Sequence, residues 1–147
     1  KVKQVLGFVG LDDAAKLFPD QMSGGMKMRA SIARALITNP DLLLMDEPFG
    51  ALDELSRAQL DEDLFKFSKE KEITVLFVTH SIYEAAFLSD RVLVMASHPG
   101  RLVDEILIKG PNLRDHSYRM TPTFFDACTS IQKSLGALSL KGRSNNV

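Results

Sequence analysis

The apolar run Leu42–Met45, followed directly by Asp46 and Glu47, constrains the fold more than any other segment. The preceding Asn39-Pro40 pair ends a helical pattern, because proline lacks the N–H donor and disfavours helix in the residue before it. A continuous apolar run of strand length that ends in acids is typical of a parallel strand buried on both faces. We therefore expect this segment to be a buried strand of a parallel sheet.

Helical and strand patterns alternate along the rest of the chain. The expected helices are 2–9, 23–38, 53–71, 81–90 and one opened by Thr121-Pro122, and the expected strands are 72–80, 91–95 and 102–108. The last two strands are spaced as an antiparallel hairpin around His98-Pro99-Gly100. We predict an α/β fold with a mainly parallel sheet, flanking helices, antiparallel edge strands and a C-terminal helix.

Apolar residues recur on one face of the expected helices, most clearly in helix 53–71 and in the last helix. In helix 53–71 this face holds Leu60, Leu64 and Phe67. In the last helix it holds Phe124, Phe125, Cys128, Ile131, Leu135 and Leu138. We expect the last helix to dock on its own domain, and segment 141–147 to be a frayed tail.

The composition excludes several classes of protein. The chain has 147 residues, 45% hydrophobic and 25% charged, with a formal net charge of −1. This near-balance argues against a general nucleic-acid binder, which normally carries a basic excess. Cys128, the single cysteine, excludes an internal disulfide framework. No apolar run approaches the length that spans a bilayer, and the first residues do not form a signal peptide.

Asp46 and Glu47 are candidate catalytic acids. The carboxyl end of a strand in an α/β sheet opens onto the crevice where such sheets bind ligands. One acid can hold Mg²⁺ through water while the other accepts a proton from an attacking water. The alternative is a strand that simply ends in acids at the surface.

Two further candidates are Ser23-Gly24-Gly25 and His80. Glycines at the start of a helix let backbone N–H groups approach an anion, and Ser23 can add its hydroxyl. The same residues also suit a plain helix cap. His80 follows an expected strand, where its imidazole could donate a hydrogen bond to a terminal phosphate, although a structural role is the alternative.

The order and spacing of "MSGGM", "LLLMDEP", "GALD" and "VTH" resemble the ATP-binding cassette (ABC) ATPases over nearly the whole chain. "MSGGM" is similar to the family signature, usually LSGGQ, and departs from it at Met22 and Met26. "LLLMDE" resembles the Walker B strand with the catalytic glutamate, "GALD" the D-loop, and His80 the switch histidine. The chain looks most like importers of the nitrate, sulfonate, taurine and thiamine-precursor group.

The resemblance implies a role for each matching residue. Asp46 would bind Mg²⁺ through water, Glu47 would polarise the hydrolytic water, and His80 would contact the γ-phosphate of ATP. Asp53 would help to link two sites across a head-to-tail dimer of cassettes. The signature residues would touch ATP held by the opposite subunit: Ser23, Gly24, Gly25 and Met26. The departure at Met26 leaves the contact normally made by glutamine unassigned.

The resemblance also implies partners and a place in the cell. These are a second cassette, transmembrane permease subunits and, indirectly, a solute-binding protein, with no nucleic acid. The subunit would lie in the cytoplasm, peripheral on the inner face of the membrane. Alternatives are a non-catalytic partner or remnant that donates its signature to an intact cassette, and an ABC ATPase of DNA repair or chromosomes.

The Walker A pattern G-x-x-x-x-G-K-[ST] and the Q-loop do not occur in the 147 residues. We therefore expect the C-terminal part of a cassette over 1–110, with the signature helical subdomain from 1 to about 40, and a linker, helix and tail over 111–147. In the family the Walker A strand separates the strand ending at His80 from the one starting at Arg91. Its absence predicts a gap or a non-native pairing there, an exposed strand edge, and no ATP hydrolysis by this chain alone.

Overall fold

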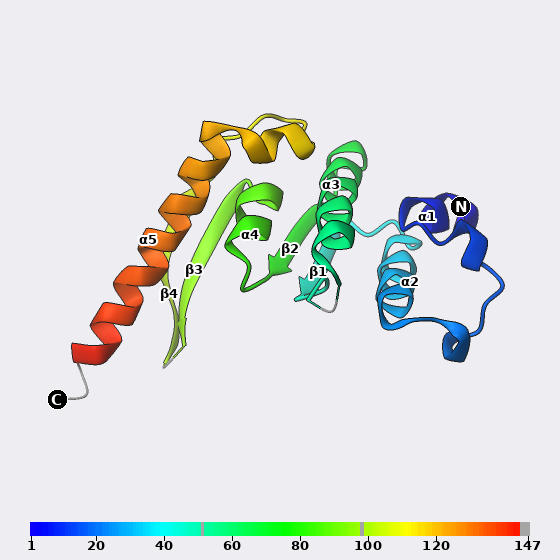
Figure 1. Ribbon diagram of the computed structural model, residues 1–147, viewed down its shortest axis with the longest axis horizontal. Helices are drawn as coiled ribbons and strands as arrows, with labels where there is room; N and C mark the ends of the chain where they lie inside the picture. Colours follow the sequence, from blue (N-terminus) through cyan, green and yellow to red (C-terminus); the bar gives the residue numbers. More distant parts are fainter. Residues whose placement is uncertain (51, 98, 145–147) are drawn as a thin grey trace. The chain divides into compact units, whose positions relative to one another are not determined.

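The computed structural model describes residues 1–50, 52–97 and 99–144, with side chains in the last helix as far as residue 137 (Figure 1). Ala51 of the "GALD" segment, His98, the Leu138 side chain and the end of the expected tail lie outside the described residues. The chain divides into two compact units, Lys1–Val78 and Thr79–Val147. Each unit is described by itself.

The first unit contains a parallel β-α-β arrangement preceded by helices. Its elements are α1 (Val2–Phe8), two 3-10 turns (Asp12–Ala14 and Pro19–Gln21), α2 (Gly24–Leu36), β1 (Leu42–Asp46), α3 (Glu54–Glu70) and β2 (Thr74–Val78). The strands pair in parallel from Leu42 with Thr74 to Asp46 with Val78. The helix between them supplies the crossover that parallel strands require.

The expectation that β1 is buried on both faces is wrong in this unit. Leu43 and Met45 are buried, whereas Leu42 and Leu44 are 54% and 66% exposed. Alternate side chains of a strand point to opposite faces, so one face of β1 is covered and the other is not. Among the described residues, no element of this unit buries that second face.

Helices α2 and α3 begin where side chains can cap them. Ser23 accepts a hydrogen bond from the Met26 N–H, and Asp53 accepts one from the Ser56 N–H. Such bonds satisfy N–H groups that a helix leaves free in its first turn. On the predicted apolar face of α3, Leu60 and Leu64 are buried. Phe67, which is half-buried, lies with its ring 4.6 Å from that of Phe8 in α1.

The second unit contains a hairpin covered by a long helix. Its elements are α4 (Ile82–Leu88), β3 (Arg91–Ser97), β4 (Gly100–Leu107), a 3-10 helix (His116–Met120) and α5 (Pro122–Ser144). The strands are antiparallel, with a register shift between Val94 and Met95. Helix α5 packs against α4 and both strands, as expected for docking within its own domain (Figure 1).

The apolar face predicted for α5 is narrower in the structure. Phe124 and Ile131 are buried and Cys128 is half-buried, but Phe125 and Leu135 are 54% and 37% exposed. The helix also runs to Ser144, so the residues from 141 to 144 are helical and not a tail. No proline follows Pro122 to interrupt the helix, and extending an established helix costs far less than starting one.

The parallel and antiparallel pairs agree with the predicted strand directions. Within the part of the chain that the structure describes, they are two separate sheets, and β2 shares no ladder with β3. The predicted non-native pairing of these two strands is therefore not found there. No helix in the described ranges is both long and apolar enough to cross a membrane.

Candidate functional site

The signature residues form the first turn of α2. Ser23 has extended backbone angles, and its Oγ lies 3.2 Å from the Met26 nitrogen. The cap predicted as the alternative to anion binding is therefore present. At Gly24 an added Cβ would meet nothing within 4 Å, so the space beside this turn is open to a ligand. The helix behind it presents its positive end.

Gly25 faces the segment that follows β1. A Cβ at this position would lie 3.0 Å from Cδ2 of the buried Leu52, which is closer than such atoms normally approach. The signature turn and the D-loop segment therefore lie side by side within the first unit. This contact joins residues 27 positions apart in sequence, and the motif pattern did not reveal it.

The carboxylate of Asp53 caps helix α3. Its Oδ1 accepts from the Ser56 N–H at 2.9 Å, and this hydrogen bond is the main cause that lowers the pKa of the exposed carboxyl. The Arg57 guanidinium donates to the carbonyl of the adjacent Leu52 at 3.0 Å. The D-loop residue is thus a fixed, ionised helix cap at the start of α3.

Glu47 has a strained backbone beside the end of β1. Its φ is +42°, in the left-handed region that residues other than glycine rarely adopt. Two hydrogen bonds hold it: its N–H donates to the Val78 carbonyl at 2.8 Å, and its carbonyl accepts from the Gly50 N–H at 3.2 Å. Strain of this kind persists where the surroundings impose it, often at functional sites. The exposed Glu47 side chain is therefore aimed by a fixed turn.

Asp46 is the last residue of β1, and its side chain is exposed. Its carboxylate makes no hydrogen bond or ion pair with any described residue. No group of three or more His, Cys, Asp or Glu that could hold a metal occurs among the described residues. A single available carboxylate suits Mg²⁺, which keeps several waters and takes its other ligands from substrate phosphates.

His80 lies at the start of the second unit, in a turn that its neighbours fix. Thr79 Oγ1 donates to the carboxylate of the buried Glu84 and accepts from the Ser81 N–H at 2.9 Å. Ser81, the first residue of the expected helix 81–90, caps α4 and accepts from the Glu84 N–H at 3.3 Å. Sequence reasoning missed Glu84, although its place three residues after a capping serine is the spacing of a capping box.

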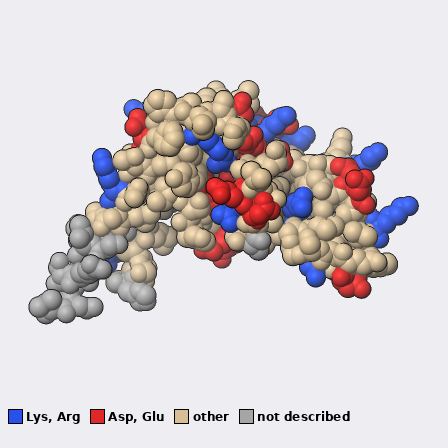
Figure 2. Space-filling model, viewed as in Figure 1, with Lys and Arg blue, Asp and Glu red and all other residues tan. Residues whose placement is uncertain are grey.

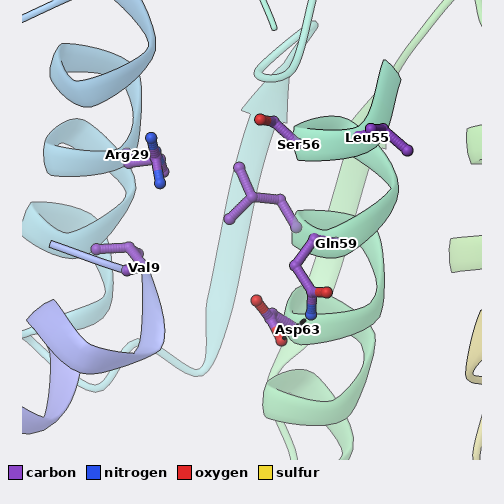
Figure 3. Close-up of a pocket in the computed structure, with 8 residues that line it drawn as sticks. Val9, Arg29, Leu55, Ser56, Gln59 and Asp63 are labelled. Atoms are coloured by element: carbon purple, nitrogen blue, oxygen red, sulfur yellow. Dashed lines mark hydrogen bonds between the residues drawn. The ribbon is translucent and has the colours of Figure 1, made fainter. Parts of the chain in front are cut away.

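A pocket of about 290 Å³ lies between α1, α2 and α3 (Figure 3). Arg29 of α2 lines one side, and Gln59 and Asp63 of α3 line the other. Gln59 donates to Asp63 at 3.1 Å, while burial raises the pKa of the Asp63 carboxyl. The pocket borders α3 just after the Asp53 cap and contains none of the predicted phosphate-contacting residues.

The first unit thus holds the turn predicted as the signature, the segment predicted as the D-loop, and the two acids at the end of β1, Asp46 and Glu47. A shared crevice for His80, Asp46 and Glu47 stays a prediction, as do the roles assigned to individual residues. On the face seen in Figure 2, basic and acidic side chains are both spread over the surface, in keeping with 18 basic and 19 acidic residues.

Comparisons with known proteins agree with these features. Residues 1–50 match the family described as ABC transporter. The chain is 56% identical over 100 residues to the taurine import ATP-binding protein of Rhizobium johnstonii, covering 68% of this chain and 38% of that protein. It is 44% identical over 127 residues to the bicarbonate transport ATP-binding protein of Synechococcus elongatus, covering 85% and 46%.

A solved structure shows the same fold. It is an ATP-binding cassette in a dimeric post-hydrolysis state bound to ADP and Pi, with a TM-score of 0.65, 34% identity, and coverage of 73% of this chain and 45% of that one. The fold is therefore that of the P-loop NTPase cassettes. The chain belongs to the ATP-binding cassette family, among relatives named for import, and it spans about half or less of the length of the curated relatives it matches, from 38% to 52%.

Proposed function

We propose that this chain is part of the ATP-hydrolysing subunit of an ABC importer that couples ATP hydrolysis to uptake of a small solute. The observation that carries the proposal is the end of β1, where Asp46 is available and Glu47 is held in a strained turn. Relatives named for taurine, aliphatic sulfonates and bicarbonate support an importer of small molecules. The choice of solute belongs to the permease and solute-binding protein.

Each residue has a role in this proposal. Asp46 holds Mg²⁺ through water, and that ion neutralises charge on the phosphates when ATP is bound. Glu47 orients the attacking water and accepts its proton, as phosphoryl transfer requires. His80 donates a hydrogen bond to the γ-phosphate.

The signature residues act across a head-to-tail dimer of cassettes. The open first turn of α2 supports this role, because its free N–H groups and positive end suit a phosphate brought by the second subunit. Ser23, Gly24, Gly25 and Met26 contact that ATP, and Asp53 links the two sites. The subunit works at the cytoplasmic face of the membrane, on transmembrane permease partners.

The 147 residues alone do not hydrolyse ATP in this proposal. Nearly all catalysis in phosphoryl transfer comes from positioning and electrostatic stabilisation of the phosphates. The sequence offers no G-x-x-x-x-G-K-[ST] loop to hold them in line with the water that Glu47 activates.

The test joins the amino-terminal part of the taurine import relative, up to its signature region, to residues 1–147. We expect Mg²⁺-dependent ATP hydrolysis, and a loss of about 10²–10³-fold in turnover with Glu47→Gln while ATP binding is kept. Glu70→Gln, the same change on an exposed residue of α3, serves as the control and keeps full turnover. Full turnover in Glu47→Gln would overturn the assignment. Turnover by the 147 residues alone that Glu47→Gln abolishes would overturn the need for the phosphate loop.

A further inference from the structure

Arg114 is a buried arginine at the carboxyl end of α4, the helix that begins two residues after His80. It is 5% exposed, and its Nη1 donates to the carbonyls of Phe87 at 2.6 Å and Ser89 at 2.9 Å. Its Nη2 lies 3.6 Å from Oδ1 of Asp90. The last carbonyls of a helix lack partners within it, and a cation there is favoured by the helix dipole. Arg114 therefore closes the end of α4.

The segment that carries Arg114 is tightly packed around it. Cζ of Arg114 lies 5.3 Å from the centre of the buried Tyr118 ring. A Cβ at Gly110 would lie 2.8 Å from the Tyr118 hydroxyl and 2.9 Å from Nε of Arg114. Gly110 and Tyr118 thus pack closely on the guanidinium, and any side chain larger than glycine at position 110 would press on it.

The opposite end of α4 is fixed by the hydrogen bonds around His80. Thr79, Ser81 and Glu84 bond to one another on both sides of that residue. Helix α4 has seven residues, fewer than an isolated helix needs to be stable in water. The conformation of the turn at His80 therefore depends on what holds α4 in place.

We propose that Arg114 is a positioning residue for His80. It acts through α4: the guanidinium holds the last carbonyls of the helix, the helix holds Glu84, and Glu84 holds Thr79 in the turn that presents His80. The segment from Gly110 onward is thus an integral support of the switch histidine. The catalytic role of His80 rests on the proposed function. The dependence of the His80 turn on Arg114 does not.

The test uses the 147-residue chain and a substitution that displaces Arg114 without removing any of its groups. Gly110→Ala would push a methyl group against Nε of Arg114, while Gly100→Ala, where a Cβ meets nothing within 4 Å, is the matched control. Two quantities are measured. One is hydrogen exchange of the backbone amides from Ser81 to Ser89, and the other is the NMR signal of the His80 imidazole.

We expect Gly110→Ala and Arg114→Met each to speed exchange in α4 by about tenfold or more and to shift the His80 signal. Gly100→Ala should leave both unchanged. A general loss of stability would speed exchange in β3 and β4 as much as in α4. Faster exchange confined to α4, together with a shifted His80 signal, would indicate positioning instead. Unchanged α4 exchange in both variants, or α4 amides already unprotected in the original chain, would overturn the proposal. Failure of the proposed function would appear differently. The fusion of the taurine import relative with residues 1–147 would then not hydrolyse ATP, while the exchange result for α4 would still hold.

Discussion

Asp53, which caps α3, and Asp63, which lies within it, have pKa values displaced in opposite directions. The hydrogen bond from Ser56 lowers the pKa of Asp53, so its charged form contributes stability above the ordinary pKa and loses it as pH falls. Burial raises the pKa of Asp63, so its charge costs stability above the ordinary pKa, and that cost disappears as pH falls. The same substitution should therefore have opposite effects at the two positions.

We predict that Asp63→Asn raises the thermal midpoint at pH 7 by about 1–2 °C, because solvent screens a partly buried charge and limits the gain. Asp53→Asn should lower the midpoint at the same pH. Both differences should shrink as pH approaches 4. Thermal unfolding followed by circular dichroism across this range is the measurement, and equal shifts of the same sign at both positions would contradict it.

Residue-scale features were predictable from sequence when their cause was local. The caps at Ser23, Ser81 and Thr121 depend on hydrogen bonds to groups three residues away, which the sequence displays. The hydrogen bond from Arg114 to the Phe87 carbonyl at the end of α4 was not predictable, because the two residues are 27 positions apart and are joined by tertiary packing. The strain at Glu47 likewise depends on its partner Val78 in another strand.

At the scale of elements, α5 shows that an apolar pattern in the sequence predicts only part of which side chains are buried. Phe124 and Phe125 are adjacent, yet Phe124 is 2% exposed and packs edge-on to Tyr118 at 5.4 Å, while Phe125 is 54% exposed. The sequence placed both on one face. A helix contacts its neighbours along a stripe, and the width of that stripe is set by the elements it meets, which for α5 are α4 and the hairpin.

We predict that Phe124→Ala lowers the free energy of unfolding of the second unit by about 3–5 kcal/mol, since a large buried ring leaves a cavity. Phe125→Ala, its matched neighbour, should change it by about 0.5 kcal/mol or less. Hydrogen exchange of the α5 amides, followed as the urea concentration is raised, measures the free energy of unfolding of both variants. Similar losses from the two substitutions would show that both sides of α5 are covered.

At the scale of the whole molecule, the sheet of the first unit has one bare apolar face. Leu44 and Leu76 are directly paired across β1 and β2, and they are 66% and 53% exposed. Exposed apolar surface and unpaired strand edges promote association between chains. The fold class was evident from the sequence, but this bare face was not, because β1 has the composition of a strand covered on both sides.

We predict that the 147-residue chain self-associates at micromolar concentration, and that the double substitution Leu44→Thr and Leu76→Thr reduces this association. Threonine keeps the strand preference while removing apolar surface. Leu43→Thr, on the buried face, should instead destabilise the unit. Light scattering against concentration is the measurement. Light scattering that shows the original chain to stay monomeric over this concentration range would contradict the prediction.

The contact between Gly25 and Leu52 restricts how this part of the protein can change over generations. A methyl group at position 25 would come within 3.0 Å of the leucine side chain, whereas position 24 has open space. Alanine at position 25 would therefore require either a shift of the Leu52 side chain by a few tenths of an ångström or a smaller residue at position 52. Positions 25 and 52 should therefore vary together among descendants of this sequence, whereas packing does not restrict position 24.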